Sequence, residues 1–177
     1  MSGSDDNASV AIRPAQESDL QACRVIEDSA GEIFIEIGMT EINDDPPRNL
    51  EDLRAALDRE DLWVACDAND VPVAFALANT IECSLHVAEI DVLRHWQRQG
   101  IGRRLIDHLA VTAATRGMEA LTLTTFRDVP WNAPYYERLG FAVLPEAQWG
   151  PELTALVTAE EHHGLDRRSR VVMRRPL

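Results

Sequence analysis

The sequence contains no lysine, so all 17 of its basic residues are arginine. Aspartate and glutamate number 30, which gives a formal net charge of −13 and an isoelectric point near 4.7. A nucleic-acid-binding surface needs a basic patch that pairs with phosphates. The charge balance therefore argues against a nucleic-acid partner and favours a cationic one, although acidity also serves solubility.

Cysteine and metal-binding patterns are scarce as well. Cys23, Cys66 and Cys83 are an odd number at wide spacing, which fits neither a disulfide framework nor a metal-binding pair. We expect all three to be small, buried hydrophobic side chains. The adjacent His162 and His163 would project about 100° apart on a helix, so we expect no metal site.

Long apolar runs are also missing. They fall well short of the ~18 residues that span a bilayer, so no membrane segment is expected. Residues 1–9 are polar and acidic, which is typical of a flexible tail and not of a signal peptide. We therefore expect a cytoplasmic protein with a single domain at residues 10–177, a length that suffices for one hydrophobic core.

The hydrophobic pattern alternates between short strands and helices. Strands are expected at residues 10–13, 62–66, 73–78, 85–93, 120–125, 141–144 and 170–174. Helices are expected at residues 20–27, 50–58, 101–113, 132–139 and 151–162, with a mixed segment at 31–48. Asn49 should cap the second helix, and Gly117 should end the third, whose apolar stripe is Ile101, Leu105, Ile106, Leu109 and Ala113. A tight polar turn at 67–70 should join the strands 62–66 and 73–78 in a hairpin. Hairpins come first and strand–helix–strand units follow, which predicts an α/β (α+β) fold with one mixed sheet flanked by helices.

A glycine turn stands where the expected strand at 85–93 passes into the next helix. Gly100 and Gly102 allow backbone N–H groups to crowd around an anion, and the helix N-terminus adds partial positive charge. Arg98, Arg103 and Arg104 can add guanidinium groups that grip phosphate oxygens. The turn suits a pyrophosphate, but it also fits a plain tight turn, because a dinucleotide fingerprint and a P-loop are both incomplete here.

Two motifs favour the pyrophosphate interpretation. The first is Val92 followed by Gln97-Arg98-Gln99-Gly100-Ile101-Gly102, and the second, further along, is Tyr136-Glu137-Arg138-Leu139-Gly140-Phe141. The first resembles the acetyl-CoA signature Q/R-x-x-G-x-G/A of the GNAT family of N-acetyltransferases, and the second resembles the Tyr-Glu-x-x-Gly-Phe motif of that family. The order of elements is similar over residues 10–177, and the segment 123–136 resembles a bacterial subgroup whose substrates are mostly unassigned.

The resemblance implies a largely antiparallel GNAT-like sheet with a V-shaped opening between strands 85–93 and 120–125. Acetyl-CoA is then the co-substrate, with its pantetheine arm in that opening, and no metal takes part. A main-chain donor near Val92 would polarise the thioester carbonyl. The residues implied to bind the co-substrate are Ile90, Asp91, Val92, Gln97, Arg98, Gln99, Gly100, Ile101, Gly102, Arg103 and Asn132.

Transfer to an amine needs a base for the amine and an acid for the leaving thiolate. Glu89 and Asp91 are two apart on a strand that we expect to be central, so they share one face, and burial should raise the pKa of whichever is desolvated. The resemblance implies Glu89 as the base and Tyr136 as the acid. Asp91 and His86 stay alternatives for the base, and one or both of Glu89 and Asp91 could instead pair with an arginine such as Arg13 or Arg127.

The resemblance assigns recognition of the acceptor to Phe34, to the acidic loop at 41–45 and to the stretch at 149–152. Acidic side chains there suit a cationic amine on a small molecule or a peptide. A homodimer is a further expectation, in which an acidic surface would meet a basic C-terminal segment that contains Arg167, Arg168, Arg170, Arg174 and Arg175.

Two other functions stay open from the residues alone. A non-catalytic acyl-CoA-binding sensor or subunit would keep the phosphate turn without using Glu89 or Tyr136. A nucleotide-binding enzyme would use the same turn for ATP or NAD, but its motifs are incomplete. The function that the sequence predicts is acyl-CoA-dependent N-acyl transfer, of acetyl to a primary amine by direct attack.

Overall fold

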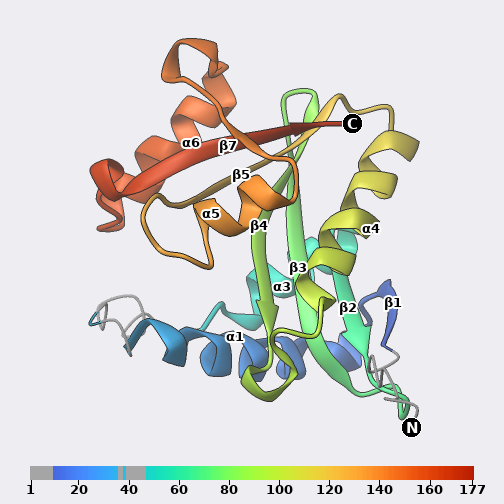
Figure 1. Ribbon diagram of the computed structural model, residues 1–177. Coiled ribbons are helices and arrows are strands. Elements are labelled where there is room, and N and C mark those ends of the chain that lie inside the picture. Colours follow the sequence, from blue (N-terminus) through green and yellow to red (C-terminus); the bar gives the residue numbers. More distant parts are fainter. Residues whose placement is uncertain (1–9, 36–37, 39–46) are drawn as a thin grey trace, which may run out of the picture. The chain divides into compact units, whose positions relative to one another are not determined.

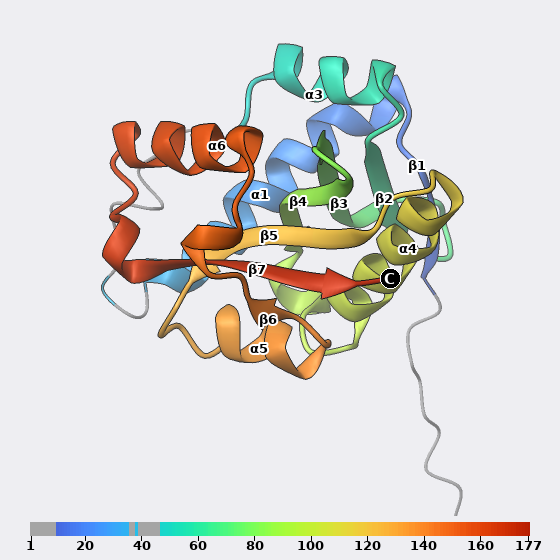
Figure 2. The same ribbon diagram turned by 90° about the horizontal axis from the view of Figure 1, so that it is seen from above.

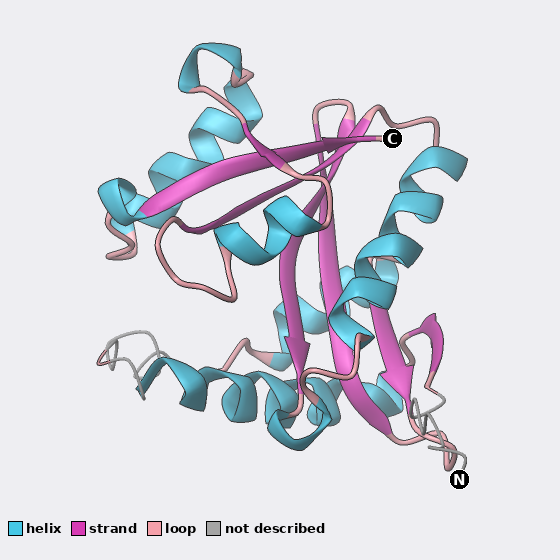
Figure 3. Cartoon of the chain, viewed as in Figure 1, coloured by secondary structure: helices cyan, strands magenta, loops and turns pink. Residues whose placement is uncertain are grey.

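The computed structural model describes residues 10–35, 38 and 47–177 (Figure 1). The expected tail at residues 1–9 and the acidic loop at 41–45 lie outside the described residues. Among the described residues, β1 is followed by helices and then by the consecutive strands β2, β3 and β4, after which helices and strands alternate, as Figure 3 shows by colour. Seven strands of this part form one sheet in the order β1-β2-β3-β4-β5-β7-β6, in which β4 is central as expected.

Strand direction confirms the predicted mixed, largely antiparallel sheet. β4 and β5 pair in parallel, whereas β1 with β2, β2 with β3, β5 with β7 and β6 with β7 pair antiparallel. The chain divides into two compact units, which are described separately below. The first contains the described residues up to Leu77 together with Glu89–Ile106, and the second contains Ala78–Ala88 and Asp107–Leu177.

In the first unit, β1 (Ala11–Pro14), β2 (Leu62–Cys66) and the first part of β3 (Pro72–Ile81) form an antiparallel ladder. Every residue of β2 is buried, which explains its continuous apolar run. A tight turn closes the β2–β3 hairpin as predicted, because Asp67 Oδ1 accepts the N–H groups of Asn69 and Val71.

Helices α1 (Leu20–Ile35) and α3 (Leu50–Asp58) also belong to the first unit and contact one another. Asn49 caps α3 as predicted, since its Oδ1 accepts the Asp52 N–H at 2.8 Å. The expected irregular segment from residue 31 is wrong at its start, because α1 continues through Gly31 to Ile35. A helical glycine costs only about 1 kcal/mol, which the buried stripe of α1 outweighs.

Strand β4 (Ser84–Val92) is followed by α4 (Ile101–Thr115), and both elements contribute residues to the two units. The predicted helix stripe is confirmed, because Leu105, Ile106 and Leu109 are fully buried. Gly117 adopts φ +72° after the last turn of α4, where its N–H donates to the Ala114 carbonyl. This left-handed residue ends the helix as the sequence predicts.

In the second unit, β5 (Ala120–Phe126) pairs with the start of β4 from Ser84 opposite Ala120 to Val87 opposite Leu123. The paired register ends there, although β5 continues to Phe126. Strand β7 (Arg170–Pro176) runs antiparallel to β5 over its whole length, and the two-residue β6 (Ala142–Val143) pairs with β7.

Helices α5 (Ala133–Arg138) and α6 (Pro151–His162) lie on opposite faces of β5 and β7 (Figure 2). Leu153 and Val157 of α6 pack with Ile81 and Val172 in an apolar cluster. The N-terminus of α6 is tied to the β3–β4 turn, because Glu82 Oε1 accepts the Glu152 N–H at 3.2 Å and Glu152 Oε2 accepts the Glu82 N–H at 2.6 Å. The turn therefore supplies the helix cap that Gly150 lacks.

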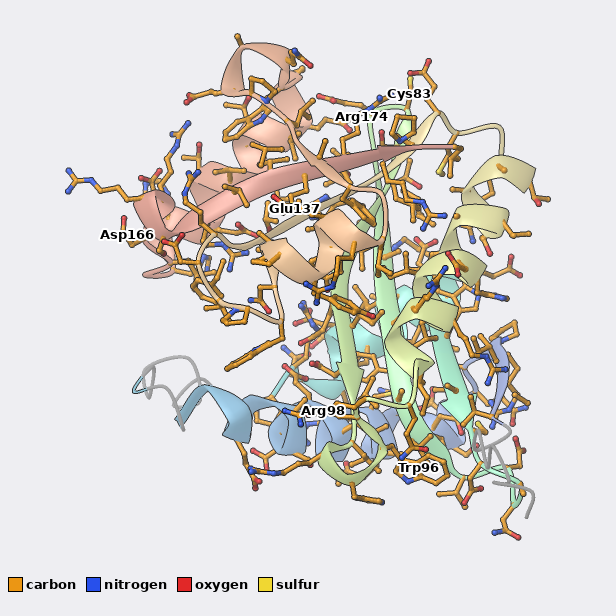
Figure 4. All side chains as sticks on the ribbon, in the orientation of Figure 1. Cys83, Trp96, Arg98, Glu137, Asp166 and Arg174 are labelled. Carbon is orange, nitrogen blue, oxygen red and sulfur yellow. The ribbon has the colours of Figure 1, made fainter. Side chains whose placement is uncertain are left out.

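Two expectations about surface residues need comment. Cys23 and Cys66 are buried, but Cys83 is exposed in the two-residue turn between β3 and β4, so the expectation is wrong for that thiol (Figure 4). The basic C-terminal segment finds acidic partners inside the chain, such as Glu160, which lies 3.3 Å from Arg170. No helix within the described residues combines the length and the apolarity needed to cross a bilayer.

Candidate active site

The turn between β4 and α4 has the backbone of an anion-binding site. Arg98, which Figure 4 labels in this turn, has φ +61°, and Gly100 has φ +77°. The first internal hydrogen bond of α4 runs from the Arg104 N–H to the Gly100 carbonyl at 3.1 Å. The N–H groups of residues 101–103, in the first turn, therefore have no acceptor within the helix, which is the arrangement that binds phosphate groups.

Glycine at position 100 serves backbone conformation and not close packing. A Cβ on Gly100 would meet no described atom within 4 Å, so only the left-handed φ disfavours a larger residue. Two glutamine side chains brace the same turn. Gln97 Nε2 donates to the Val92 carbonyl and Gln99 Nε2 to the His95 carbonyl, both at 3.2 Å. They hold the loop through its own backbone, a role that the sequence motif alone does not reveal.

The three arginines predicted around the turn differ in their contacts. Arg98 and Arg103 are exposed beside the N-terminus of α4. Arg104 Nη2 instead donates to the Val10 carbonyl at 2.7 Å and so joins the helix to the residue before β1. All three side chains are exposed and can add charge around an anion, although one nitrogen of Arg104 is already engaged.

Three carboxyl groups gather beside β4, and we call Glu27, Glu89, Asp91 and their partner Arg48 the carboxyl cluster. Glu27 and Asp91 both lie close enough to Glu89 to be affected by its charge. Arg48 Nε donates to Glu89 Oε2 at 2.8 Å, and the Arg48 backbone N–H donates to Glu27 Oε2 at 2.9 Å. Glu89 and Asp91 thus share one face of β4 as predicted, and all four residues belong to the first unit.

Glu27 and Asp91 hold protons more tightly than isolated carboxyl groups do. Burial, followed by the nearby charges of Glu89 and Glu27, raises the pKa of Asp91 well above its ordinary value. Burial and the Glu89 charge raise the pKa of Glu27 to about 7.

An arginine does pair with Glu89, as the alternative interpretation allows, but it is Arg48, and two members of the cluster were not foreseen. Arg13 binds Asp19 at 2.7 Å and Asp70 at 3.0 Å, and Arg48 takes the place beside Glu89. Among the described residues, no group of His, Cys, Asp and Glu side chains has an arrangement suited to a metal ion.

His86, an alternative base, is buried in the second unit with 1% of its surface exposed. Its Nδ1 lies 3.0 Å from Thr122 Oγ1. Burial and the charge of Arg170 lower the pKa of His86 to about 4. A neutral, enclosed imidazole favours the structural interpretation of this residue over that of a base.

Tyr136, the predicted acid, is half-buried on α5. Its ring makes edge-to-face contacts with Tyr135 and with Phe141, at centroid distances of 5.4 Å and 5.7 Å. Asn132 precedes the helix, and its carbonyl accepts the N–H groups of Tyr135 and Tyr136, whereas its side chain forms no capping hydrogen bond. The aromatic contacts fix the direction of the Tyr136 ring.

The residues predicted to recognise the acceptor are only partly described. The side chain of Phe34 and the loop at 41–45 lie outside the described residues. In the stretch at 149–152, Trp149 Nε1 donates to the Leu144 carbonyl at 2.9 Å and Arg167 lies over the Trp149 ring. These contacts serve the packing of α6, and a part in binding the acceptor stays a prediction.

A model of the acetyltransferase (GNAT) family matches residues 26–141, which is well over half of the chain. The chain belongs to the GNAT family. The matched segment of this GNAT protein includes the whole carboxyl cluster, the turn before α4 and Tyr136. The predicted family is thereby confirmed, and the finer bacterial subgroup stays a prediction.

Solved structures with a similar fold include complexes with coenzyme A. N-acetylglutamate synthase from Neisseria gonorrhoeae, complexed with coenzyme A and N-acetylglutamate, gives a TM-score of 0.72 at 18% identity; the match covers 96% of the GNAT chain, which spans 35% of the synthase. PaiA N-acetyltransferase from Thermoplasma acidophilum, with coenzyme A, gives 0.63 at 17% identity, over 96% and 99% of the two chains. Rv2747 from Mycobacterium tuberculosis, also with coenzyme A, gives 0.69 at 19% identity, over 94% and 99%.

Proposed function

We propose that the chain transfers an acetyl group from acetyl-CoA to a primary amine, with Glu89 as the base. The proposal rests on the residues of β4 and of the turn between β4 and α4. Glu89 stands on β4 within the carboxyl cluster, and β4 leads into a turn whose backbone exposes N–H groups at the start of α4. Membership of the GNAT family supports the same class of reaction.

The turn and the strand backbone would hold the co-substrate. The N–H groups from Gln97 to Arg103 would bind the pyrophosphate, and the backbone of residues 90–92 would pair with the pantetheine arm. Val92 would offer its N–H in this role, because its carbonyl already accepts the Gln97 side chain. Coenzyme A in several solved neighbours supports this choice of co-substrate.

Direct attack accounts for the chemistry with two proton transfers. The amine nitrogen forms a bond to the thioester carbonyl carbon as the carbon–sulfur bond breaks, and the amine proton passes to the Glu89 carboxylate. The leaving thiolate takes a proton from the Tyr136 phenol, a role that rests on the family motif. The net charge of −13 favours a cationic acceptor, either a small molecule or a peptide.

Release of free coenzyme A thiol from acetyl-CoA tests the proposal. We would assay polyamines, aminoglycosides, amino acids and peptides as acceptors, with Glu89→Gln beside the wild type and the exposed Glu51→Gln as a matched control. General-base loss should reduce acceptor-dependent release by about 100-fold or more, with acetyl-CoA binding retained. A melting temperature raised by acetyl-CoA without release would favour a non-catalytic acyl-CoA binder, and the lack of both effects would contradict the proposal.

A further inference from the structure

A cavity of about 360 Å³ opens in the second unit, and every described residue that lines it belongs to that unit. Its walls come from the β3–β4 turn, the start of β5, the segment between β6 and α6, the first turn of α6 and β7. The described residues that line it include no member of the carboxyl cluster, of the turn before α4 or of α5. Its volume lies within the range of roughly 300–1,000 Å³ that is typical of small-molecule sites.

Hydrogen bonds hold the walls of this cavity in place. The Glu119 N–H, just before β5, donates to the Cys83 carbonyl in the β3–β4 turn at 2.8 Å. The reciprocal contacts of Glu82 and Glu152 tie the same turn to the start of α6. The ladder that joins β5 to β7 holds a third wall. The cavity is therefore formed before any ligand arrives, as is usual for a binding site.

Part of the cavity wall is apolar. Ile81 and Leu153 belong to a buried cluster against which Leu144 packs, and all three residues line the cavity. A hydrocarbon group of a ligand would lose its contacts with water against these aliphatic side chains, which favours binding. This wall therefore suits a ligand with an aliphatic group.

Two opposite charges also line the cavity, on Arg174 and Glu119. Arg174 is two residues from Val172, which packs with residues of α6, so the Arg174 side chain leaves β7 on the α6 face. Arg174 Nη2 lies 3.8 Å from Glu119 Oε2, which is too long for a hydrogen bond. Among the described residues neither side chain has a hydrogen-bond partner, so both can bind a ligand.

We propose that this cavity binds a free α-amino acid with an aliphatic side chain, at a site built from residues other than those proposed for acetyl transfer. The ligand carboxylate pairs with the Arg174 guanidinium, which can hold it through two parallel hydrogen bonds. The ligand ammonium pairs with the Glu119 carboxylate. An α-amino acid carries both charges on one carbon, which matches a cation and an anion that stand side by side in the cavity wall. The hydrocarbon group then lies on the apolar wall.

Cys83 reports on occupation of the cavity without any assay of activity. It lines the cavity beside Arg174 and is exposed (Figure 4), whereas the other two cysteines of the sequence, Cys23 and Cys66, are buried. Alkylation of the full-length protein by iodoacetamide, followed by mass spectrometry, measures the reaction rate of this thiol. L-leucine at ten times its apparent dissociation constant should slow alkylation of Cys83 about tenfold, because only the free protein reacts. Cys83→Ser, the control, should take up no label in the same time.

Two analogues of leucine test the need for both charges. Isocaproate lacks the ammonium group and leucinamide lacks the carboxylate, so each should protect Cys83 at least about tenfold more weakly than leucine. Unchanged alkylation with leucine up to the millimolar range would overturn the proposal. Equal protection by isocaproate or leucinamide would overturn the assignment of the ligand as an amino acid.

Matched arginine variants test the place of binding. Arg174→Gln should lose the protection by leucine, whereas Arg175→Gln should keep it, because Arg175 pairs with Asp107 at 3.1 Å and does not line the cavity. Glu119→Gln changes a side chain that is 70% exposed, so its fold should persist even if that of Arg174→Gln does not. In this variant leucine and isocaproate should protect equally. Protection by leucine that is the same in the wild type, Arg174→Gln and Glu119→Gln would overturn the proposal.

A last comparison separates this cavity from the site of acetyl transfer. Glu89→Gln should show the same protection of Cys83 by leucine as the wild type, because Glu89 does not line the cavity. Protection that is lost in Glu89→Gln and kept in Arg174→Gln would place leucine at the transfer site and overturn the proposal. Protection that grows with protein concentration in the absence of leucine would show that a second copy of the chain covers the cavity, and would overturn it as well.

Discussion

Arg48 Nε lies 2.8 Å from Glu89 Oε2, although the two residues are 41 positions apart in the chain. Their side chains are 35% and 17% exposed, so the pair is screened by water much less than a surface salt bridge is. The contact fixes the chain that enters α3 against the strand that carries the proposed base. Arg48 thereby offsets part of the negative charge of the carboxyl cluster.

Replacement of this arginine should destabilise the protein in a pH-dependent way. Arg48→Gln leaves the carboxyl groups without a cation, so the free energy of unfolding should fall by about 2 kcal/mol at pH 8. The loss should shrink at pH 5, where the carboxyl groups hold more protons. Urea unfolding at both pH values measures the effect, and Arg54→Gln, which breaks an exposed pair with Glu17, should change little. An equal loss at both pH values would contradict the assignment.

The raised pKa of Glu27 predicts a stability change of defined sign. Its pKa moves from 4.5 to about 7, so between these values the folded protein holds a proton that the unfolded chain releases. This residue therefore makes the unfolding free energy fall as pH rises across that range. As pH rises from 4.5 to 7.5, the unfolding free energy of Glu27→Gln should increase relative to that of the wild type by on the order of 2 kcal/mol, a figure reduced for the partial exposure of Glu27. Chemical denaturation at several pH values would show no such gain if Glu27 were solvated.

The lowered pKa of His86 predicts a stability change with pH of the opposite sign. Its pKa is lowered from 6.5 to about 4, so the unfolded chain binds a proton in this range that the folded protein does not. Stability from the neutral imidazole is therefore lost as pH falls from 6.5 to 4. In His86→Gln, the decrease in unfolding free energy between pH 6.5 and pH 4 should be smaller than in the wild type by about 3 kcal/mol. Replacement of the exposed His162 by Gln should leave that decrease unchanged. Denaturation curves for His86→Gln that parallel the wild type at every pH would rule out this contribution.

Gly150 and Glu82 predict a mutational coupling in the second unit. A Cβ on Gly150 would lie 1.8 Å from Glu82 Oε1, so Gly150→Ala must displace the carboxylate that caps α6. The lost hydrogen bond should cost about 1 kcal/mol. In a Glu82→Ala background the same change should be neutral or slightly stabilising, because alanine restricts the unfolded chain. A double-mutant cycle of thermal unfolding with strictly additive effects would contradict this coupling.

The fold could be predicted closely because its signals are local. The apolar run of β2, the Asn49 cap and Gly117 each act within a few residues, and the structure confirms all three. The end of α1 could not be predicted from Gly31, because propensity is a weak force beside the packing of a buried stripe. The exposed Cys83 shows the same limit, since burial depends on where a turn falls.

The part of the candidate site that consecutive residues form could be predicted from the sequence. β4 and the turn after it place Glu89, Asp91 and Gly100 by local geometry. Arg48 was missed because its contact with Glu89 spans distant parts of the chain, and no spacing rule brings them together. Glu27 did carry a signal, as it is a carboxylate on the apolar stripe of a helix, which indicates a buried polar contact.

The two groups with shifted pKa values, Glu27 and His86, lie in different units of the chain. Glu27 belongs to the first unit and His86 to the second, and their titrations cover nearly the same pH range with opposite sign. Their effects on the global unfolding free energy therefore offset one another, while local stability shifts. As pH rises, hydrogen exchange should quicken in the strands of the first unit and slow in β5 and β7, so acidity decides which half of the chain opens first.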